Sequence, residues 1–270
     1  MIVLQALPLM ACGRLNYDAL DTSVIDADLI DAEVPLACGP MELSAGVIAH
    51  YPFETQTIDD GVGNHDGRLV GTAQALGNAS PCGGWLELGP SLYGVIPDSS
   101  EWDLAEGSLD LWVRPDAPPP TGSVGILARD AFGKNEAGHI LLGYMSDGRI
   151  IVRIQAVDGG GAPDIMCSES ALAVGEWVHI GVNFGLPDTQ LFIDGIRHQG
   201  LGGGSIGPND YSCNRTVGRG IATNRNPWGI GVALHDSADG SEIPVIDPYT
   251  GAVDELRISS TRRDFSILNR

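Results

Sequence analysis

The chain has 270 residues, and its 35 acidic residues outnumber the 15 basic ones, which gives a formal net charge of −20 at pH 7. A charge of this size repels the phosphates of nucleic acid and of anionic lipids, so we expect neither as a direct partner. The 37 glycines and 17 prolines favour many turns over long helices, and the length suffices for one large all-β domain or two small ones.

The first twelve residues are apolar and end in Leu9-Met10-Ala11-Cys12. This run is shorter than the ~20 residues that span a bilayer, but it fits the apolar region and small-residue cleavage site of an export signal. Its last four residues resemble a bacterial lipobox, in which Cys12 would be lipidated. No Lys or Arg precedes the run. We therefore predict a signal peptide with a lipobox over 1–12 and a true start upstream; the alternative is a buried first strand with a free Cys12.

Residues 13–40 are predicted to form an acidic, flexible tether. Asp18 to Glu33 is rich in carboxylates and holds no basic residue, so charge repulsion opposes compact packing. The apolar side chains within this stretch leave open a short helix or a segment that docks on a partner.

The rest of the chain, from about residue 46, reads as a series of short strands separated by turns. Alternating apolar and polar residues indicate strands with one buried face. In chain order they are 46–54, 84–89, 93–98, 104–115, 124–129, 138–145, 149–157, 175–195 and 251–258. The clearest alternation lies in 178–184, and Asp194-Gly195 suits a tight hairpin because both positions tolerate positive φ.

The cysteine count favours export. If Cys12 is lipidated, an even number remains, which suits two disulfides in an oxidising compartment. Four cysteines allow three pairings. We predict Cys38–Cys82 and Cys167–Cys213, because each pair joins neighbouring parts of the chain.

Several motifs in this order resemble the laminin-G-like, concanavalin A-like jelly-roll domains of bacterial surface proteins. They are Tyr51-Pro52-Phe53-Glu54, the loop 59–71, GWLELG at 84–89 and YGVIPD at 93–98, SLDLWVRP at 108–115, GEWVH at 175–179 with LFIDG at 191–195, and GAVDELRI at 251–258. The resemblance implies an all-β, two-sheet antiparallel jelly-roll sandwich over residues 41–262, followed by a C-terminal tail at 263–270. It also implies that the last strand lies beside the first.

A structural calcium ion is a second implication of this resemblance. Related domains often hold calcium where the last strand meets the first loop, which here corresponds to Asp60, Asn64 and Asp254, with Glu54 as a further ligand. Calcium prefers several oxygen ligands from carboxylate-rich loops. The alternative is that these side chains only accept hydrogen bonds within Asx turns.

Catalysis is not expected. Retaining glycosidases place two carboxyls about 5–5.5 Å apart, usually from a Glu-x-Asp-x-x-Glu strand, and this sequence has no such strand. It also lacks the Gly-x-Ser-x-Gly and His-Glu-x-x-His motifs. A divergent glycoside hydrolase or lyase on the same fold and a purely structural adhesion module remain the alternatives.

We therefore predict a non-catalytic, exported module, lipid-anchored in the bacterial cell envelope or secreted. It would bind carbohydrate or a protein partner through its sandwich loops. Trp228, in the Asn- and Arg-bearing loop 224–228, is the expected stacking residue, with Tyr211 and Tyr249 next; the same loop could equally pack on itself. The other four tryptophans lie on or beside expected strands, where packing is their expected role: Trp85, Trp102, Trp112 and Trp177.

Overall fold

The computed structural model describes residues 46–55, 57–71, 80–129, 138–155, 163–200, 213–221, 224–236, 242–246 and 248–266. All of these belong to one compact unit, Val34–Arg270. The predictions for residues 1–40, including Cys12 and Cys38, and the prediction for Tyr211 lie outside the described residues. In the described part of the chain, no helix has the length and apolar character needed to cross a membrane.

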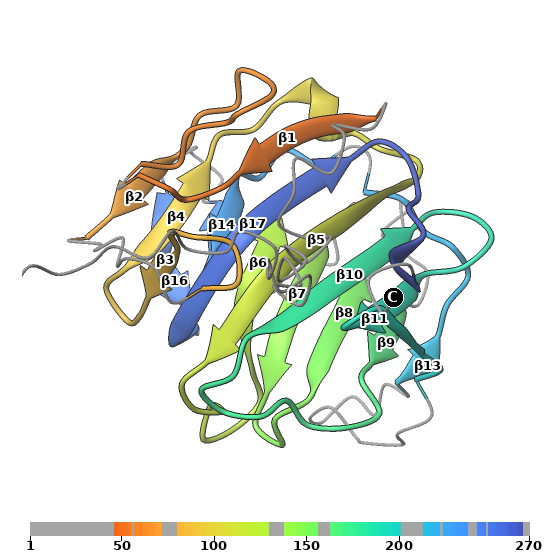
Figure 1. Ribbon diagram of the computed structural model, residues 1–270. Helices are drawn as coiled ribbons and strands as arrows, with labels where there is room; N and C mark the ends of the chain where they lie inside the picture. Colours follow the sequence, from red (N-terminus) through yellow and green to blue (C-terminus); the bar gives the residue numbers. More distant parts are fainter. Residues whose placement is uncertain are drawn as a thin grey trace, which may run out of the picture. The chain divides into compact units, whose positions relative to one another are not determined.

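Two antiparallel sheets face one another (Figure 1). The first sheet has the order β1–β17–β5–β10–β11–β12, with β3 also paired to β17. The second has the order β13–β9–β8–β7–β6–β14–β4–β2, and β15 pairs separately with β16. This arrangement confirms the predicted two-sheet sandwich.

The strands have the following bounds. The first sheet consists of β1 (Val47–Tyr51), β3 (Leu86–Leu88), β5 (Gly107–Pro115), β10 (Val178–Phe184), β11 (Gln190–Ile193), β12 (Ile196–His198) and β17 (Gly251–Ser259). The second consists of β2 (Arg68–Val70), β4 (Tyr93–Ile96), β6 (Ser123–Arg129), β7 (Ile140–Met145), β8 (Ile150–Ile154), β9 (Asp164–Cys167), β13 (Asn214–Arg215) and β14 (Trp228–Ile230). The remaining elements are β15 (Ala233–Asp236), β16 (Glu242–Ile246) and the short 3₁₀ helix η1 (Ser100–Trp102).

The predicted alternation of β5 and β10 is confirmed and decides which face is buried. In register, Leu109 lies opposite Val182 and Leu111 opposite Ile180, and all four side chains are buried in the core between the sheets. Side chains at the intervening positions point to the other side of the first sheet. We call that side, which faces away from the second sheet, the outer face.

Strand β17 lies between β1 and β5, so the predicted return of the C-terminal strand to the N-terminal one is confirmed. The Asp194-Gly195 turn between β11 and β12 has φ values of 47° and 73°, as the hairpin prediction requires.

The Cys167–Cys213 disulfide is confirmed and ties the last residue of β9 to the residue that precedes β13. Its sulfurs belong to a small apolar cluster with Met145, Ile151 and Ile165. Cys82 is disulfide-bonded, but Cys38 is not among the described residues, so the Cys38–Cys82 pairing stays a prediction.

Candidate functional site

The predicted ligand-stacking residues Trp228 and Tyr249 are both 0% exposed, so this prediction is wrong. Trp228 lies in β14, between β6 and β4 of the second sheet, and packs edge-on against Trp102 with ring centroids 6.3 Å apart. Tyr249 packs edge-on against Tyr144 at 6.2 Å. Neither ring offers a surface to a sugar.

The loop that precedes Trp228 is held inward by the buried guanidinium of Arg129. Its Nη2 donates to the carbonyl oxygen of Asn224 at 2.6 Å, and its Nε donates to that of Asn226 at 3.1 Å. In return, Asn224 Nδ2 donates to the carbonyl oxygen of Arg129 at 2.6 Å. The loop therefore packs on itself and on β6, which was the alternative interpretation of its sequence.

Asp60, one of the predicted calcium ligands, is occupied as a hydrogen-bond acceptor. Its two oxygens accept the backbone N–H groups of His50, Val62 and His65 at 3.0–3.2 Å and contact Nδ1 of His65 at 3.0 Å. Burial alone would raise the pKa of Asp60, but these donors together lower it. Asp60 thus fixes the loop through an Asx turn. Neighbouring Asn64 takes no part in these contacts and lines, together with His65, a polar hollow of about 310 Å³.

Two of the predicted calcium ligands, Glu54 and Asp254, are brought together by the turn at residues 80–84. Ser80 Oγ donates to Asp254 Oδ2 at 2.6 Å, and the backbone N–H of Gly84 donates to Glu54 Oε2 at 3.0 Å. Burial, with smaller contributions from the charges of Glu255 and Glu54, raises the pKa of Asp254 to about 7. Ionisation of the buried Asp254 carboxyl is therefore unfavourable unless a cation binds beside it.

The backbone beside both carboxylates adopts an uncommon conformation. Phe53 and Glu255 have φ values of 54° and 52°, in the left-handed region that residues other than glycine rarely adopt. A β-bulge interrupts the β17–β5 pairing directly after Asp254. Strained residues and bulges concentrate at binding sites, where they aim particular groups.

The donor chemistry of this pair fits a hard cation in part. Two carboxylates and the Ser80 hydroxyl form an all-oxygen set, as calcium prefers. Within the described ranges, however, no group of three or more His, Cys, Asp or Glu side chains is arranged to hold a metal. Backbone carbonyls or water would have to complete the coordination.

Sequence reasoning missed an aromatic site on the outer face of the first sheet, formed by Trp85, Arg114 and Trp177. The Arg114 guanidinium carbon lies 5.6 Å from the Trp85 ring centroid and 5.4 Å from that of Trp177. The two rings contact each other edge-on at 6.2 Å. Trp85 is buried, whereas Trp177 and Arg114 are partly exposed. We call this set, with Glu87, the Trp–Arg–Trp site.

Glu87 holds the two polar groups of this site in place. Its carboxylate accepts the Nε1–H of Trp85 at 3.1 Å and the Nη2 of Arg114 at 3.1 Å. Strand register places the site across the sheet, because Glu87 lies opposite Ala252 of β17, and Ala252 lies opposite Arg114 of β5. The small Ala252 side chain leaves the Arg114–Glu87 pair room to meet above it.

The outer face continues from this site along β5 and β10. Partly exposed Trp112 is paired in register with His179, and their rings contact edge-on at 5.4 Å. Next along β5 is Asp110, whose Oδ1 lies 3.1 Å from Nε of Arg257. Burial would raise the pKa of Asp110, but Arg257 and the other nearby cationic groups lower it.

The sequence contained a signal for this face. In SLDLWVRP, Trp112 and Arg114 alternate with Leu111 and Val113, which are buried, so the first two must point away from the core.

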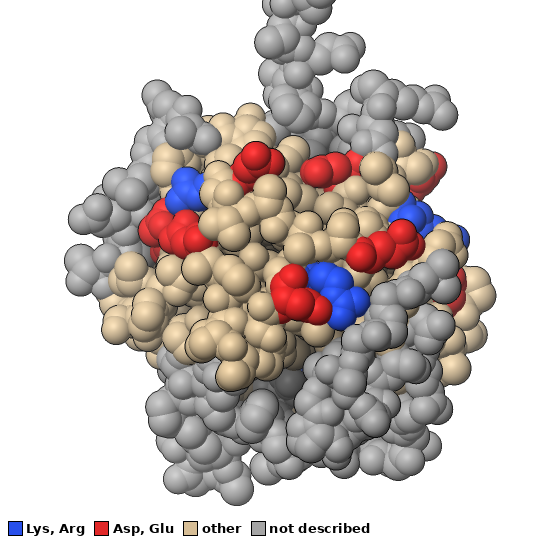
Figure 2. Space-filling model, turned by 90° about the horizontal axis from the view of Figure 1, so that it is seen from below, with Lys and Arg blue, Asp and Glu red and all other residues tan. Residues whose placement is uncertain are grey.

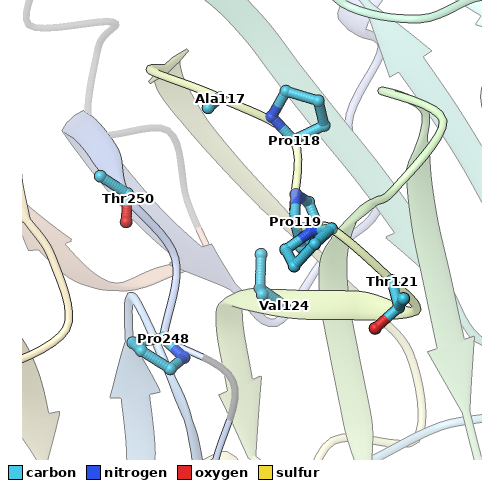
Figure 3. Close-up of a pocket in the computed structure, with 8 residues that line it drawn as sticks. Ala117, Pro118, Pro119, Thr121, Val124, Pro248 and Thr250 are labelled. Carbon is cyan, nitrogen blue, oxygen red and sulfur yellow. The ribbon is translucent and has the colours of Figure 1, made fainter.

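The described part of the chain also has a hollow of about 360 Å³, lined by the loop Ala117–Thr121 and by Val124, Pro248 and Thr250 (Figure 3). It lies by the β5–β6 loop. On the face of the molecule shown in Figure 2, acidic groups are scattered over a largely uncharged surface, and several adjoin a basic one. The lining of the hollow includes neither a charged side chain nor an aromatic ring. This hollow therefore lacks the groups that bind sugar rings.

Comparison with known structures finds the same fold at low sequence identity. Domain 4 of AbnA, an extracellular arabinanase of glycoside hydrolase family 43 from Geobacillus stearothermophilus solved with arabinotriose, has a TM-score of 0.56 and 18% identity, over 83% of this chain and 98% of that one. The binding domain of Paraclostridial Mosquitocidal Protein 1 has a TM-score of 0.57 and 13% identity, over 83% of this chain and 51% of that one.

A structure of botulinum neurotoxin type C has a TM-score of 0.54 and 14% identity, over 85% of this chain and 51% of that one. Cell entry of that toxin is described as dependent upon interaction with two ganglioside molecules. Comparison with curated protein sequences finds no match. The model of one family, Laminin_G_3, matches residues 88–264, which is well over half of the chain. Together with the two-sheet sandwich described above, this match shows that the chain belongs to the Laminin_G_3 family of the concanavalin A-like lectin/glucanase superfamily.

Proposed function

We propose that this protein is a carbohydrate-binding module without catalytic activity, and that it binds sugar on the outer face of the first sheet. The observation that carries the proposal is the Trp–Arg–Trp site. The C–H faces of sugar rings pack on indoles, and their hydroxyls accept hydrogen bonds from guanidinium groups and donate them to carboxylates held in fixed positions. Trp177 offers such a ring, and Arg114 and Glu87 offer such groups.

The comparisons support a sugar as the partner in general terms. One similar domain was solved with arabinotriose, and a toxin of this fold is described as interacting with gangliosides. A protein of the cell envelope is the alternative partner, because a flat face with tryptophan and arginine also suits protein contacts.

The charges of the site favour a neutral sugar. Arg114 is matched by Glu87 at 3.1 Å and lies 4.0 Å from Asp116. Its positive charge is therefore already balanced, and the net charge of −20 repels anionic ligands. We expect uronic and sialic acids to bind more weakly than neutral sugars of the same size.

We also propose that a calcium ion bound by Glu54 and Asp254 stabilises the fold. The support is the pair of carboxylates, the raised pKa of Asp254 and the strained backbone beside both residues. The ion would supply the positive charge that these groups lack, and Ser80 would orient the Asp254 carboxylate.

A carboxyl with a pKa near 7 beside a second carboxylate also suits a general acid of a glycoside hydrolase, which is the alternative function. Burial of Asp254 argues against it. Its side chain is 0% exposed, so a glycosidic bond cannot reach it without rearrangement of the strand.

Export to the cell envelope remains part of the proposal. Its support within the described residues is the Cys167–Cys213 disulfide, since such bonds persist in oxidising compartments. Attachment through a lipid on Cys12 is proposed from the sequence alone.

Replacing Trp177 with Ala should weaken sugar binding at least tenfold, because it removes the stacking ring and one contact of Arg114. The measurement is a panel of neutral and acidic oligosaccharides, tested by calorimetry with calcium and with chelator. Leu186→Ala is the matched control, because Leu186 is 70% exposed and lies outside the Trp–Arg–Trp site. If Trp177→Ala binds every sugar as the unaltered protein does, the site is wrong; if no sugar binds the unaltered protein, a protein partner replaces carbohydrate. Reducing-end assays on the same panel test for hydrolysis.

A further inference from the structure

After β17 the chain turns back and crosses the outer face of the first sheet. Ser108 Oγ donates to the carbonyl oxygen of Thr261 at 2.9 Å. The backbone N–H of Arg263 donates to Asn183 Oδ1 at 2.9 Å, and Asn183 Nδ2 donates to the carbonyl oxygen of Arg263 at 2.8 Å. In Figure 1 the dark blue segment that follows β17 runs down to β10 and β11. We call residues 260–266 the C-terminal strap.

Phe265 anchors the strap in a socket above β10. Its side chain is 2% exposed, and its ring lies 5.5 Å from that of Phe192 and 6.1 Å from that of His179. The floor of the socket is Gly181. A Cβ atom at this position would come within 2.6–2.9 Å of three ring carbons of Phe265, so the ring fits only because residue 181 is glycine.

Beneath the strap lies a buried polar cluster. Asp110 Oδ1 contacts Nε of Arg257 at 3.1 Å and Nε2 of His179 at 3.4 Å, while Arg263 of the strap lies 3.7 Å from Asp110 Oδ2. The strap thus places one positive charge over Asp110. It also buries polar groups that water would otherwise hydrate.

Three buried polar atoms in and beside this cluster have no hydrogen-bond partner among the described residues: Asp110 Oδ2, Trp112 Nε1 and His179 Nδ1. Buried groups without partners weaken a closed state, because opening the cover restores their hydrogen bonds to water. They are also complementary to sugar hydroxyls, which both donate and accept.

The described part of the strap forms no strand ladder with β10. Its first residue, Ser260, donates its backbone N–H to the carbonyl oxygen of Gly46 at 2.7 Å. Arg262 donates to the carbonyl oxygens of Phe184, Gly185 and Asp188 at 2.7–3.3 Å and to Oδ1 of Asp188 at 3.2 Å. These bonds hold the start of the strap, whereas its far end is held by the Phe265 ring.

We propose that the C-terminal strap closes the second half of the sugar-binding face, and that its release extends this face to longer glycan chains. The inference rests on the proposed function. Trp112 and His179 adjoin the Arg114–Trp177 contact, so the opened face would run along β10 from Trp177 to Asn183, about 20 Å at ~3.3 Å per residue. With the strap in place, ligand binds only at the Trp–Arg–Trp site.

Two substitutions in the full chain test the strap: one lies in the strap itself and the other in β10 beneath it. Phe265→Ala removes the ring, and Gly181→Ala fills its socket, so misfolding of one leaves the other informative. Ser266→Ala, an exposed neighbour, is the control. Hydrogen–deuterium exchange in residues 260–266 reports release without any ligand, and we expect faster exchange in both variants than in the control.

Affinity is then measured for oligosaccharides of increasing length of the sugar that the unaltered protein binds. We expect the affinity of the unaltered protein to stop rising beyond short chains, and both variants to gain about tenfold for the longest chains while short ones are unchanged. Faster exchange with an unchanged length dependence would overturn the inference and leave the proposed function intact. Unchanged exchange in both variants would also overturn it. If no length of sugar binds any form, the proposed function fails, and the inference with it.

Discussion

In a calcium-free buffer, Asp254→Asn should make the protein more stable at pH 8 and have a smaller effect at pH 5. The pKa of Asp254 is raised to about 7, above the ~3.9 of an unfolded chain, so the folded state holds the proton more tightly. Stability is therefore lost as the pH rises from about 4 through 7. The gain from Asn, which mimics the protonated carboxyl, grows from about 1.5 kcal/mol at pH 5 to about 4 kcal/mol at pH 8.

With calcium present at pH 8, we expect the unaltered protein to be more stable than Asp254→Asn. An ion between Glu54 and Asp254 stabilises the unaltered protein by binding the folded state alone, and Asp254→Asn removes that gain. Urea unfolding at both pH values, with calcium or with chelator, measures each effect, and Glu176→Gln serves as the control because Glu176 is an exposed carboxylate. A pH effect without a calcium effect would mean that the pair is not a calcium site. Destabilisation by Asp254→Asn at pH 8 in chelator would contradict the account of the buried carboxyl.

Arg129→Lys should lower the free energy of unfolding by about 3 kcal/mol or more. The 0% exposed guanidinium donates to Asp98 and to four backbone carbonyl oxygens: those of Trp102, Ile221, Asn224 and Asn226. A lysine ammonium presents three donors from one atom and cannot reach acceptors spread over three segments.

The matched control for Arg129 is Arg225→Lys. The Arg225 side chain is 69% exposed, and its ion pairs to Asp98 and Asp103 measure 3.8 and 4.0 Å. Such pairs contribute about 0–1 kcal/mol. Equal losses for the two substitutions in urea unfolding would contradict the role of Arg129 in holding the loop inward.

The alternation of apolar and polar residues predicted the strands well, because in a strand every second side chain points to the buried face. The alternation in β5 and β10 and the Asp194-Gly195 turn were predicted in this way and are confirmed. The return of β17 to β1 is also confirmed, but it was implied by the resemblance to laminin-G-like domains and not by the local pattern. The Cys167–Cys213 pair was also predicted correctly, since it joins neighbouring strands of one sheet.

The site was harder to predict, because it depends on which distant strands become neighbours. Trp85, Arg114 and Trp177 meet only through the β3–β17–β5–β10 order, which alternation does not reveal. The prediction that Trp228 is an exposed stacking residue was wrong because a distant residue buries a loop that looks exposed in the sequence. The Asn- and Pro-bearing loop before Trp228 has the composition of an exposed loop, yet Arg129, about a hundred residues earlier in the chain, holds it inward.

Sugar binding at the Trp–Arg–Trp site can be tested by NMR, by following the indole N–H signals of the five tryptophans during titration with a neutral oligosaccharide. We expect the Trp177 and Trp85 signals to shift together with increasing sugar, while those of Trp102 and Trp228, which are 0% exposed, stay in place. The Trp112 signal should join them once the strap is released by Phe265→Ala. Shifts that leave Trp177 and Trp85 unchanged, with binding established by calorimetry, would contradict the assignment of the sugar site to this face.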